Sequence, residues 1–161
     1  MPKITPCLWF NDNAEEAVRF YLSIFTHSKM GKITRYGDAG ARVSGRPKGS
    51  VMTATFELDG LEFVALNGGP IFTFNEAVSF QVDCATQDEV DYYWEALAAG
   101  GDPDAQQCGW LKDKYGVSWQ IVPTVLPDML QDSDPERAER VMQAVLQMKK
   151  IDIRTLQQAY Q

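Results

Sequence analysis

Apolar and polar residues along the first 67 positions follow a strand–helix–strand–strand–strand order. The helix is predicted where apolar residues recur at helical spacing behind Asn13, which stands three residues before Glu16, close to a capping box. Asp59-Gly60 predicts a tight hairpin between the last two strands. The predicted elements are a strand at 3–10, a helix at 14–25, and strands at 29–36, 50–58 and 61–67.

The same order then begins again. Thr86 and Glu89 form a full capping box before a second amphipathic helix, and Gly100-Gly101 ends that helix as a C-cap would. The predicted elements are a strand at 76–83, a helix at 87–99, a weaker strand at 105–108, and strands at 109–113 and 117–122. The recurrence predicts an α+β chain with two βαβββ modules, residues 1–67 and 76–123.

The segments outside this repeat have a different character. Residues 37–49, rich in Gly, Arg and Ser, are predicted to form a mobile loop. Residues 124–161 are predicted to form a helical tail, with Asp134-Pro135 opening one helix and a short helix at 152–160. Because Val141, Val145 and Met148 give the tail an apolar face, it must pack on its own module or on a partner chain.

The charge distribution narrows the choice of partner and compartment. The 161-residue chain has a formal net charge of -7, and residues 50–110 contain no Lys or Arg. Nucleic-acid binding depends on basic contacts to phosphates, so we expect no such partner. No apolar stretch approaches the roughly 20 residues that span a bilayer, so we expect no membrane segment. Three cysteines without a C-x-x-C pair, and no signal peptide at the N-terminus, predict a cytoplasmic protein.

Several motifs together resemble one family. They are Ile4-Thr5-Pro6, Asn67-Gly68-Gly69-Pro70, residues 76–82, residues 108–113, residues 115–123 and the tail residues 140–152. Over essentially the whole chain, this combination is similar to the PhnB-like subgroup of the glyoxalase/bleomycin-resistance/extradiol-dioxygenase (vicinal oxygen chelate) superfamily. The resemblance implies a single domain over residues 1–161, in which each module curls its sheet into a half-barrel and the two half-barrels enclose a cavity.

The resemblance also identifies where metal-dependent members of that superfamily carry their ligands. The four positions correspond to Thr5, Ala65, Ala77 and Gln120, and none is an ionisable ligand. A divalent ion prefers imidazole or carboxylate donors, so we expect neither metal nor cofactor. The only histidine, His27, follows the first helix and is interpreted as a solvated loop residue.

Alternation along the strands then predicts which neighbours face the cavity. Leu8, Phe10, Val78, Phe80, Val82, Trp119 and Ile121 are expected on the opposite face, against the helices. Cys7 has no base beside it and is interpreted as an inert thiol. The basic residues Arg35, Arg42, Arg46 and Lys48 are either a solvated surface or an anion clamp. The predicted ligand pocket consists of Thr5, Cys7, Trp9, Phe63, Ala65, Asn67, Ala77, Ser79, Gln81, Trp110, Ser118 and Gln120, with Val122 on the same face.

Three functions remain open. The first is a metal-free protein that binds a small molecule, which the missing ligands and the aromatic residues favour. The second is a metal-dependent lyase, isomerase or dioxygenase of the same superfamily, which the ligand count opposes. The third is a demethylubiquinone methyltransferase-type activity, the name that the subgroup often carries, although no Gly-rich turn for S-adenosylmethionine is present.

Exposed sheet edges and the apolar tail further predict a homodimer.

Overall fold

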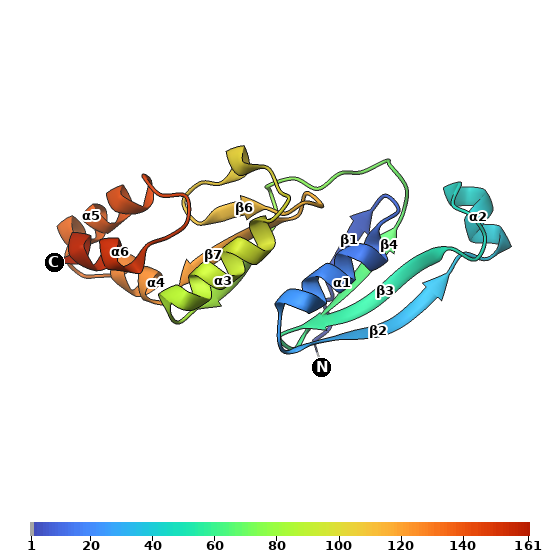
Figure 1. Cartoon of the computed structure of the whole chain (residues 1–161), viewed down its shortest axis with the longest axis horizontal. Coiled ribbons are helices and arrows are strands. Elements are labelled where there is room, and N and C mark those ends of the chain that lie inside the picture. The colour runs from blue at the N-terminus through green and yellow to red at the C-terminus, as the bar shows by residue number, and fades with distance from the viewer. Residues whose placement is uncertain (1) are drawn as a thin grey trace. The chain divides into compact units, whose positions relative to one another are not determined.

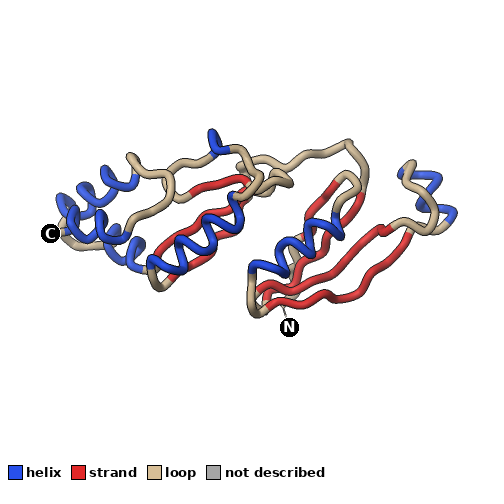
Figure 2. The backbone as a smooth tube through the Cα atoms, viewed as in Figure 1, coloured by secondary structure: helices blue, strands red, loops and turns tan. Residues whose placement is uncertain are grey.

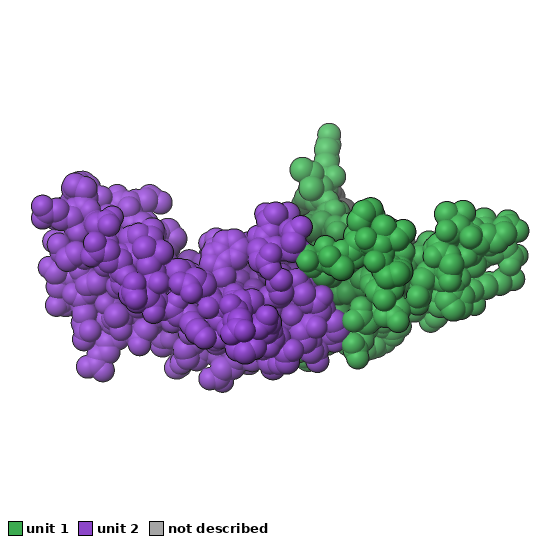
Figure 3. All heavy atoms as spheres, turned by 90° about the horizontal axis from the view of Figure 1, so that it is seen from above, with its two compact units in different colours: residues 1–74 green, residues 75–161 purple. Residues whose placement is uncertain are grey.

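The computed structural model describes residues 2–161 and forms two compact units, Met1–Phe74 and Asn75–Gln161 (Figure 3). Each unit contains one mixed sheet with one long helix packed against it, so the fold is α+β (Figures 1 and 2). Among the described residues, no helix is long and apolar enough to cross a membrane. The two mixed sheets and their helices confirm the predicted α+β class.

Unit 1 has a four-stranded sheet in the order β1-β4-β3-β2. Strand β1 pairs in parallel with β4, and the other neighbours are antiparallel. Asp59 and Gly60 both have positive φ, 50° and 82°, so they form the predicted tight hairpin between β3 and β4. The strands are β1 Cys7–Phe10, β2 Ser28–Arg35, β3 Val51–Leu58 and β4 Leu61–Asn67.

Helix α1 (Ala14–Ile24) covers one face of this sheet. Its apolar stripe is buried, and the Tyr21 ring stacks on Phe56 of β3 at 6.3 Å between centroids. The predicted cap is corrected in one respect: the Asn13 side chain accepts no capping hydrogen bond. The first helical N–H, that of Ala14, is instead bound by the side chain of Asn67 on β4, so a tertiary contact replaces the local cap.

The segment between β2 and β3 is not the irregular loop that its composition predicts. It contains a short helix, α2 (Asp38–Ser44), which ends at Gly45 in the left-handed conformation at φ 76°. None of its residues is buried. An ion pair between Lys48 and Asp38, 3.0 Å long, links the segment after the helix back to its first turn.

Unit 2 has a three-stranded sheet in the order β5-β7-β6, and helix α3 (Gln87–Ala98) packs against it. Thr86 caps α3 as predicted, because its hydroxyl accepts the Glu89 N–H at 3.2 Å. The strands are β5 Ser79–Cys84, β6 Trp110–Lys112 and β7 Ser118–Pro123.

The weaker strand predicted at 105–108 is absent from this sheet. The chain forms a 3-10 helix, η1 (Pro103–Ala105), followed by a single bridge between Gln107 and Trp110. The reason is that Cys108 and Gly109 have positive φ and donate their N–H groups to the carbonyls of Met148 and Lys149. The tail takes the hydrogen bonds that a fourth strand would have used.

The tail forms three helices, α4 (Val125–Leu130), α5 (Pro135–Val145) and α6 (Ile153–Tyr160), of which α4 was not predicted. They enclose a small core with Val141, Val145, Ile151 and Leu156 at its centre. Gln87 of α3 fastens the tail by donating to the Ile151 carbonyl and accepting from the Ile153 N–H. The apolar face of the tail is thus buried in its own unit, so Val141 and Val145 are not free to form the predicted dimer contact.

Candidate functional site

The sheet of unit 2 has one face against α3 and a second face opposite it, here called the helix-free face of β5–β7. At the end of β7, Val122 lies on this second face as predicted, but it packs against the core of the tail helices. Trp119 and Ile121 are buried on the α3 side, and the Phe80 ring lies 5.5 Å from that of Trp119. On the helix-free face the strand register aligns two rows across the sheet. One row is Ser79, Ser118 and Lys112, and the other is Gln81, Gln120 and Trp110. This placement is the one that the sequence predicts for Ser79, Gln81, Ser118, Gln120 and Trp110.

Polar groups on this face are only partly satisfied by one another. Gln120 Nε2 donates to Ser79 Oγ at 3.0 Å, and Gln81 Nε2 donates to an Asp83 carboxylate oxygen at 2.8 Å. Ser118 is 2% exposed, and its buried Oγ has no hydrogen-bond partner. An unpaired buried hydroxyl is costly, so it marks a position where a bound group would be stabilised.

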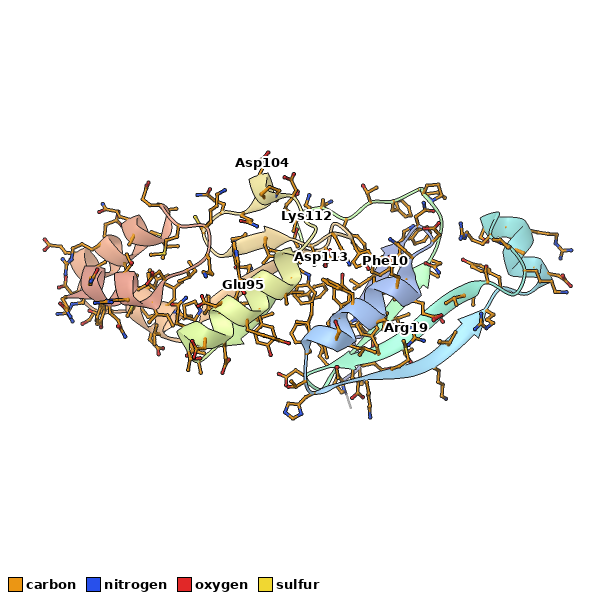
Figure 4. The ribbon with its side chains drawn as sticks, in the orientation of Figure 1. Phe10, Arg19, Glu95, Asp104, Lys112 and Asp113 are labelled. Atoms are coloured by element: carbon orange, nitrogen blue, oxygen red, sulfur yellow. The ribbon has the colours of Figure 1, made fainter. Side chains whose placement is uncertain are left out.

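A cation stands at the edge of the same face. Lys112, labelled in Figure 4 on β6, forms an ion pair with Glu76 in the turn before β5. A hydrogen bond from Lys112, with a smaller charge attraction, holds the pKa of the Glu76 carboxyl below its usual range. Glu76 is largely exposed, so the pair lies at the water boundary.

Asp113, next along the chain, is a structural residue that the sequence analysis missed. It is 2% exposed and accepts the N–H groups of Tyr115 and Val117 and the indole N–H of Trp119, at 2.8 to 3.0 Å. These bonds fix the β6–β7 turn and the Trp119 ring behind the two rows. The signal available in the sequence was an Asp two residues before a Tyr-Gly turn, where a carboxylate often accepts from the backbone.

In unit 1 the predicted face assignment is wrong on β4. Leu8 pairs with Ala65, and Leu8 is buried on the α1 side. Residues paired across a sheet share a face, so Ala65 and Phe63 lie on the α1 side too. The Phe63 ring stacks on Phe56 at 5.1 Å. Both residues are core residues rather than neighbours of Trp9 on the helix-free face, where Val64 takes the place predicted for Ala65.

Asn67 also belongs to the α1 side, because it pairs with the buried Phe10. Its Oδ1 accepts the Ala14 N–H at 2.8 Å, and its Nδ2 donates to the Val51 carbonyl at 3.1 Å. Its own carbonyl accepts from the Tyr36 hydroxyl. The side chain joins a helix to a strand, and its amide has its partners within the fold.

Cys7 and Trp9 lie on the helix-free face of unit 1, as predicted. The Trp9 indole N–H donates to the Gly69 carbonyl at 3.0 Å, and its ring meets Phe72 edge-on. A Cβ on Gly68 would lie 2.3 Å from the Trp9 ring, so only glycine fits beneath it. Cys7 is exposed, and partial desolvation raises the pKa of its thiol.

Thr5 and Ala77 lie just before β1 and β5, where both are exposed. Val78, expected against a helix, is 70% exposed for the same reason. The four positions implied as metal ligands therefore supply a hydroxyl, an amide and aliphatic groups. Within residues 2–161 no three His, Cys, Asp or Glu side chains lie close enough together to hold an ion. The donor set does not fit a divalent metal. His27 is exposed after α1.

A cavity of about 440 Å³ at the start of α1 was not predicted. Arg46 lines it together with Asp12, Glu15 and Glu16, and Arg46 Nε is buried without a hydrogen-bond partner. Two other basic residues of this region have partners of their own: Arg35 donates to the Gly49 carbonyl, and Lys48 pairs with Asp38. Acidic side chains in the lining oppose the interpretation of this region as an anion clamp.

Comparisons with known proteins agree with the family resemblance and with this fold. The family described as 3-demethylubiquinone-9 3-methyltransferase matches residues 2–122. A PhnB protein from Bacillus cereus, described as a 3-demethylubiquinone-9 3-methyltransferase, is 39% identical, with a TM-score of 0.64 over 76% of this chain and 100% of its own. PA1353 from Pseudomonas aeruginosa is 22% identical over 76% and 98% of the two chains, with a TM-score of 0.57. The fosfomycin resistance protein FosX from Mesorhizobium loti shares the fold at 12% identity, 82% and 100% coverage, and a TM-score of 0.56. No curated protein matches.

Proposed function

The chain belongs to the 3-demethylubiquinone-9 3-methyltransferase family, a PhnB-like group of the vicinal oxygen chelate superfamily, and we propose that it binds a small organic molecule without a metal ion. The observation that supports this most is the polar, partly unsatisfied helix-free face of β5–β7. Where a metal-binding relative would present a carboxylate, this face presents the Gln120 amide beside two hydroxyls. Such a surface forms hydrogen bonds with an organic ligand rather than coordinating an ion.

In unit 2, the residues proposed to contact the ligand are Ser79, Gln81, Trp110, Ser118 and Gln120. In unit 1, Cys7 and Trp9 are proposed as contact residues on the helix-free face of that unit's own sheet. The remaining predicted positions, Thr5 and Ala77, flank these strands. Phe63, Ala65 and Asn67 lie on the α1 side of the unit 1 sheet, where they are core residues and are not proposed to contact the ligand.

A ligand screen with matched variants tests this proposal. Compounds that raise the melting temperature of the wild-type chain are titrated against Gln120→Ala and against Gln143→Ala, which removes an exposed amide on α5. We expect Gln120→Ala to weaken binding about tenfold, the value of one lost hydrogen bond of moderate strength. Equal affinities for the two variants would contradict the assignment of the face.

The metal-dependent alternative is tested by restoring a carboxylate. Gln120→Glu gives β7 the residue that a metal-binding relative would have, but three of the four positions still lack a donor of the preferred kind. We expect no tight zinc or nickel binding by calorimetry. A tight site created by that one substitution would mean that other ligands are present and that the metal-free proposal is wrong.

The methyltransferase alternative is supported by the family's name and by that of the Bacillus cereus relative. A titration with S-adenosylmethionine distinguishes it from the binding proposal. We expect no heat of binding and no change in melting temperature. Saturable binding at about one molecule per chain would favour a methyl-transfer activity.

We also propose a symmetric homodimer, because β1 and β2 in one sheet and β5 and β6 in the other each pair with a single neighbour among the described residues. The tail core is not available for this contact. Light scattering at micromolar concentration should give twice the 18.1 kDa chain mass. The monomer mass would contradict the proposal.

A further inference from the structure

We propose that the helix-free face of β5–β7 carries a subsite for an oxyanion of the carboxylate type, bound by Lys112 together with the hydroxyls of Ser79 and Ser118. This inference rests on the proposed function, because it assigns one chemical group of the ligand to that same face. It adds that Lys112 binds the anionic group of the ligand and that Glu76 competes for Lys112. The binding proposal itself requires neither.

The strand register places the three donors in one line. Ser79 is the neighbour of Ser118 across β5 and β7, and Lys112 is the neighbour of Ser118 across β7 and β6. Side chains opposite one another on adjacent strands have Cβ atoms about 4.5–5.5 Å apart, so they can reach one small group. The hydroxyls of Ser79 and Ser118 and the ammonium group of Lys112 can donate hydrogen bonds to the two oxygens of a carboxylate.

The hydroxyls are ready to donate. Ser79 Oγ accepts from Gln120 Nε2, which leaves its own O–H to be directed elsewhere. Ser118 is 2% exposed, and its Oγ has no partner in the fold. A hydrogen bond to an ionised oxygen would satisfy this buried donor, and such bonds are stronger than those to neutral acceptors.

Lys112 is the sole basic residue on the three strands of this sheet. Without a ligand its charge is balanced by Glu76, a carboxylate from the turn that precedes β5. Glu76 is 63% exposed, so the pair contributes little and its exchange for another carboxylate costs little. Glu76 therefore competes with the ligand's anionic group for Lys112.

The other charged group on this face does not oppose the assignment. Asp83 lies two positions along β5 from Gln81 and accepts a hydrogen bond from the Gln81 amide. It is in the row beyond Gln120, whereas Lys112 and the two serines share one row. Trp110, next to Gln120, would contact the body of the ligand rather than its charge.

The test uses the intact chain with sodium acetate and its neutral analogue acetamide, at constant ionic strength, followed by two-dimensional NMR of the backbone amides. We expect acetate to shift the signals of Ser79, Lys112 and Ser118 saturably, and acetamide to leave them unchanged. Lys112→Met should weaken acetate binding about tenfold, whereas Lys114→Met, which removes a cation from the following turn, should not change it. Glu76→Gln should tighten acetate binding about threefold, because the competing carboxylate is gone.

Equal responses to acetate and acetamide, no saturable shift, or an unchanged affinity in Lys112→Met would each overturn the subsite. Those failures are distinct from failure of the proposed function. Neutral organic ligands that depend on Gln120 but show no acetate response would support the binding face without the subsite. An acetate response that depends on Lys112, without any organic ligand, would support the subsite alone.

Discussion

Two side-chain amides, Asn67 in unit 1 and Gln120 in unit 2, lie on strands of equivalent position but have different surroundings. Asn67 is 5% exposed and has its amide bound to backbone groups of α1 and β3. Gln120 is half-buried and donates to one serine hydroxyl on the sheet face opposite α3. The difference shows that residue type alone does not identify a ligand contact: what matters is whether the fold already supplies the partners.

The largest difference in unfolding free energy is expected between the Phe63→Ala and Trp9→Ala variants of unit 1. Phe63→Ala removes a buried ring stacked on Phe56 and should cost about 3–5 kcal/mol of unfolding free energy. Trp9→Ala removes a half-buried ring from the helix-free face and should cost clearly less. Urea denaturation of both variants measures this. The opposite order would return Phe63 to the pocket and reverse the face assignment.

The amides give the next largest difference. Asn67→Ala leaves the Ala14 N–H and the Val51 carbonyl unpaired and should cost about 2–4 kcal/mol. Gln120→Ala leaves one serine hydroxyl that water can reach and should cost less than about 1 kcal/mol. Melting temperatures of the two variants provide the measurement. A large loss in Gln120→Ala would make that amide structural as well.

Cysteine labelling compares a buried thiol, Cys84, with an exposed thiol, Cys7, and is expected to have the smallest effect on the fold. Burial, aided by the carboxylates of Glu89 and Asp83, raises the pKa of Cys84 to about 12. Its thiol is therefore protonated and shielded at pH 8, whereas Cys7 is exposed and also has a raised pKa. We expect iodoacetamide to modify Cys7 before Cys84, faster as pH rises from 8 to 9.5, and Cys84 only on unfolding. Mass spectrometry of the digested protein gives the order. Early labelling of Cys84 would contradict its placement.

The sequence predicted the strand faces of unit 2 more accurately than those of unit 1 for a physical reason. On β5 and β7, polar and apolar residues alternate, so the face of each side chain could be read directly. On β4, Phe63, Val64, Ala65 and Leu66 are all apolar, and only pairing with β1 decides which of them meet the helix. The missing strand at 105–108 depends on hydrogen bonds to residues 148 and 149, which no local pattern reveals.

Three further features were not predicted from the sequence: helix α4, Asp113 and the cavity beside Arg46. Pro127 in a six-residue helix resembles a loop signal, although proline is tolerated in a first helical turn. Asp113 receives three hydrogen bonds from residues within six positions, but its burial comes from tertiary packing. The cavity joins the segment after α2, the start of β3, the end of β4 and the start of α1, and could be found only from the fold.

The central claim is that this member of the family binds its ligand without a metal. Elemental analysis of the full chain, purified without chelators, tests it most directly when combined with melting curves in the presence and absence of EDTA. A specifically bound ion would stabilise the native state by mass action. We predict well below one divalent ion per chain and no change in melting temperature. About one zinc, nickel or iron per chain, with a lower melting temperature in EDTA, would contradict the account.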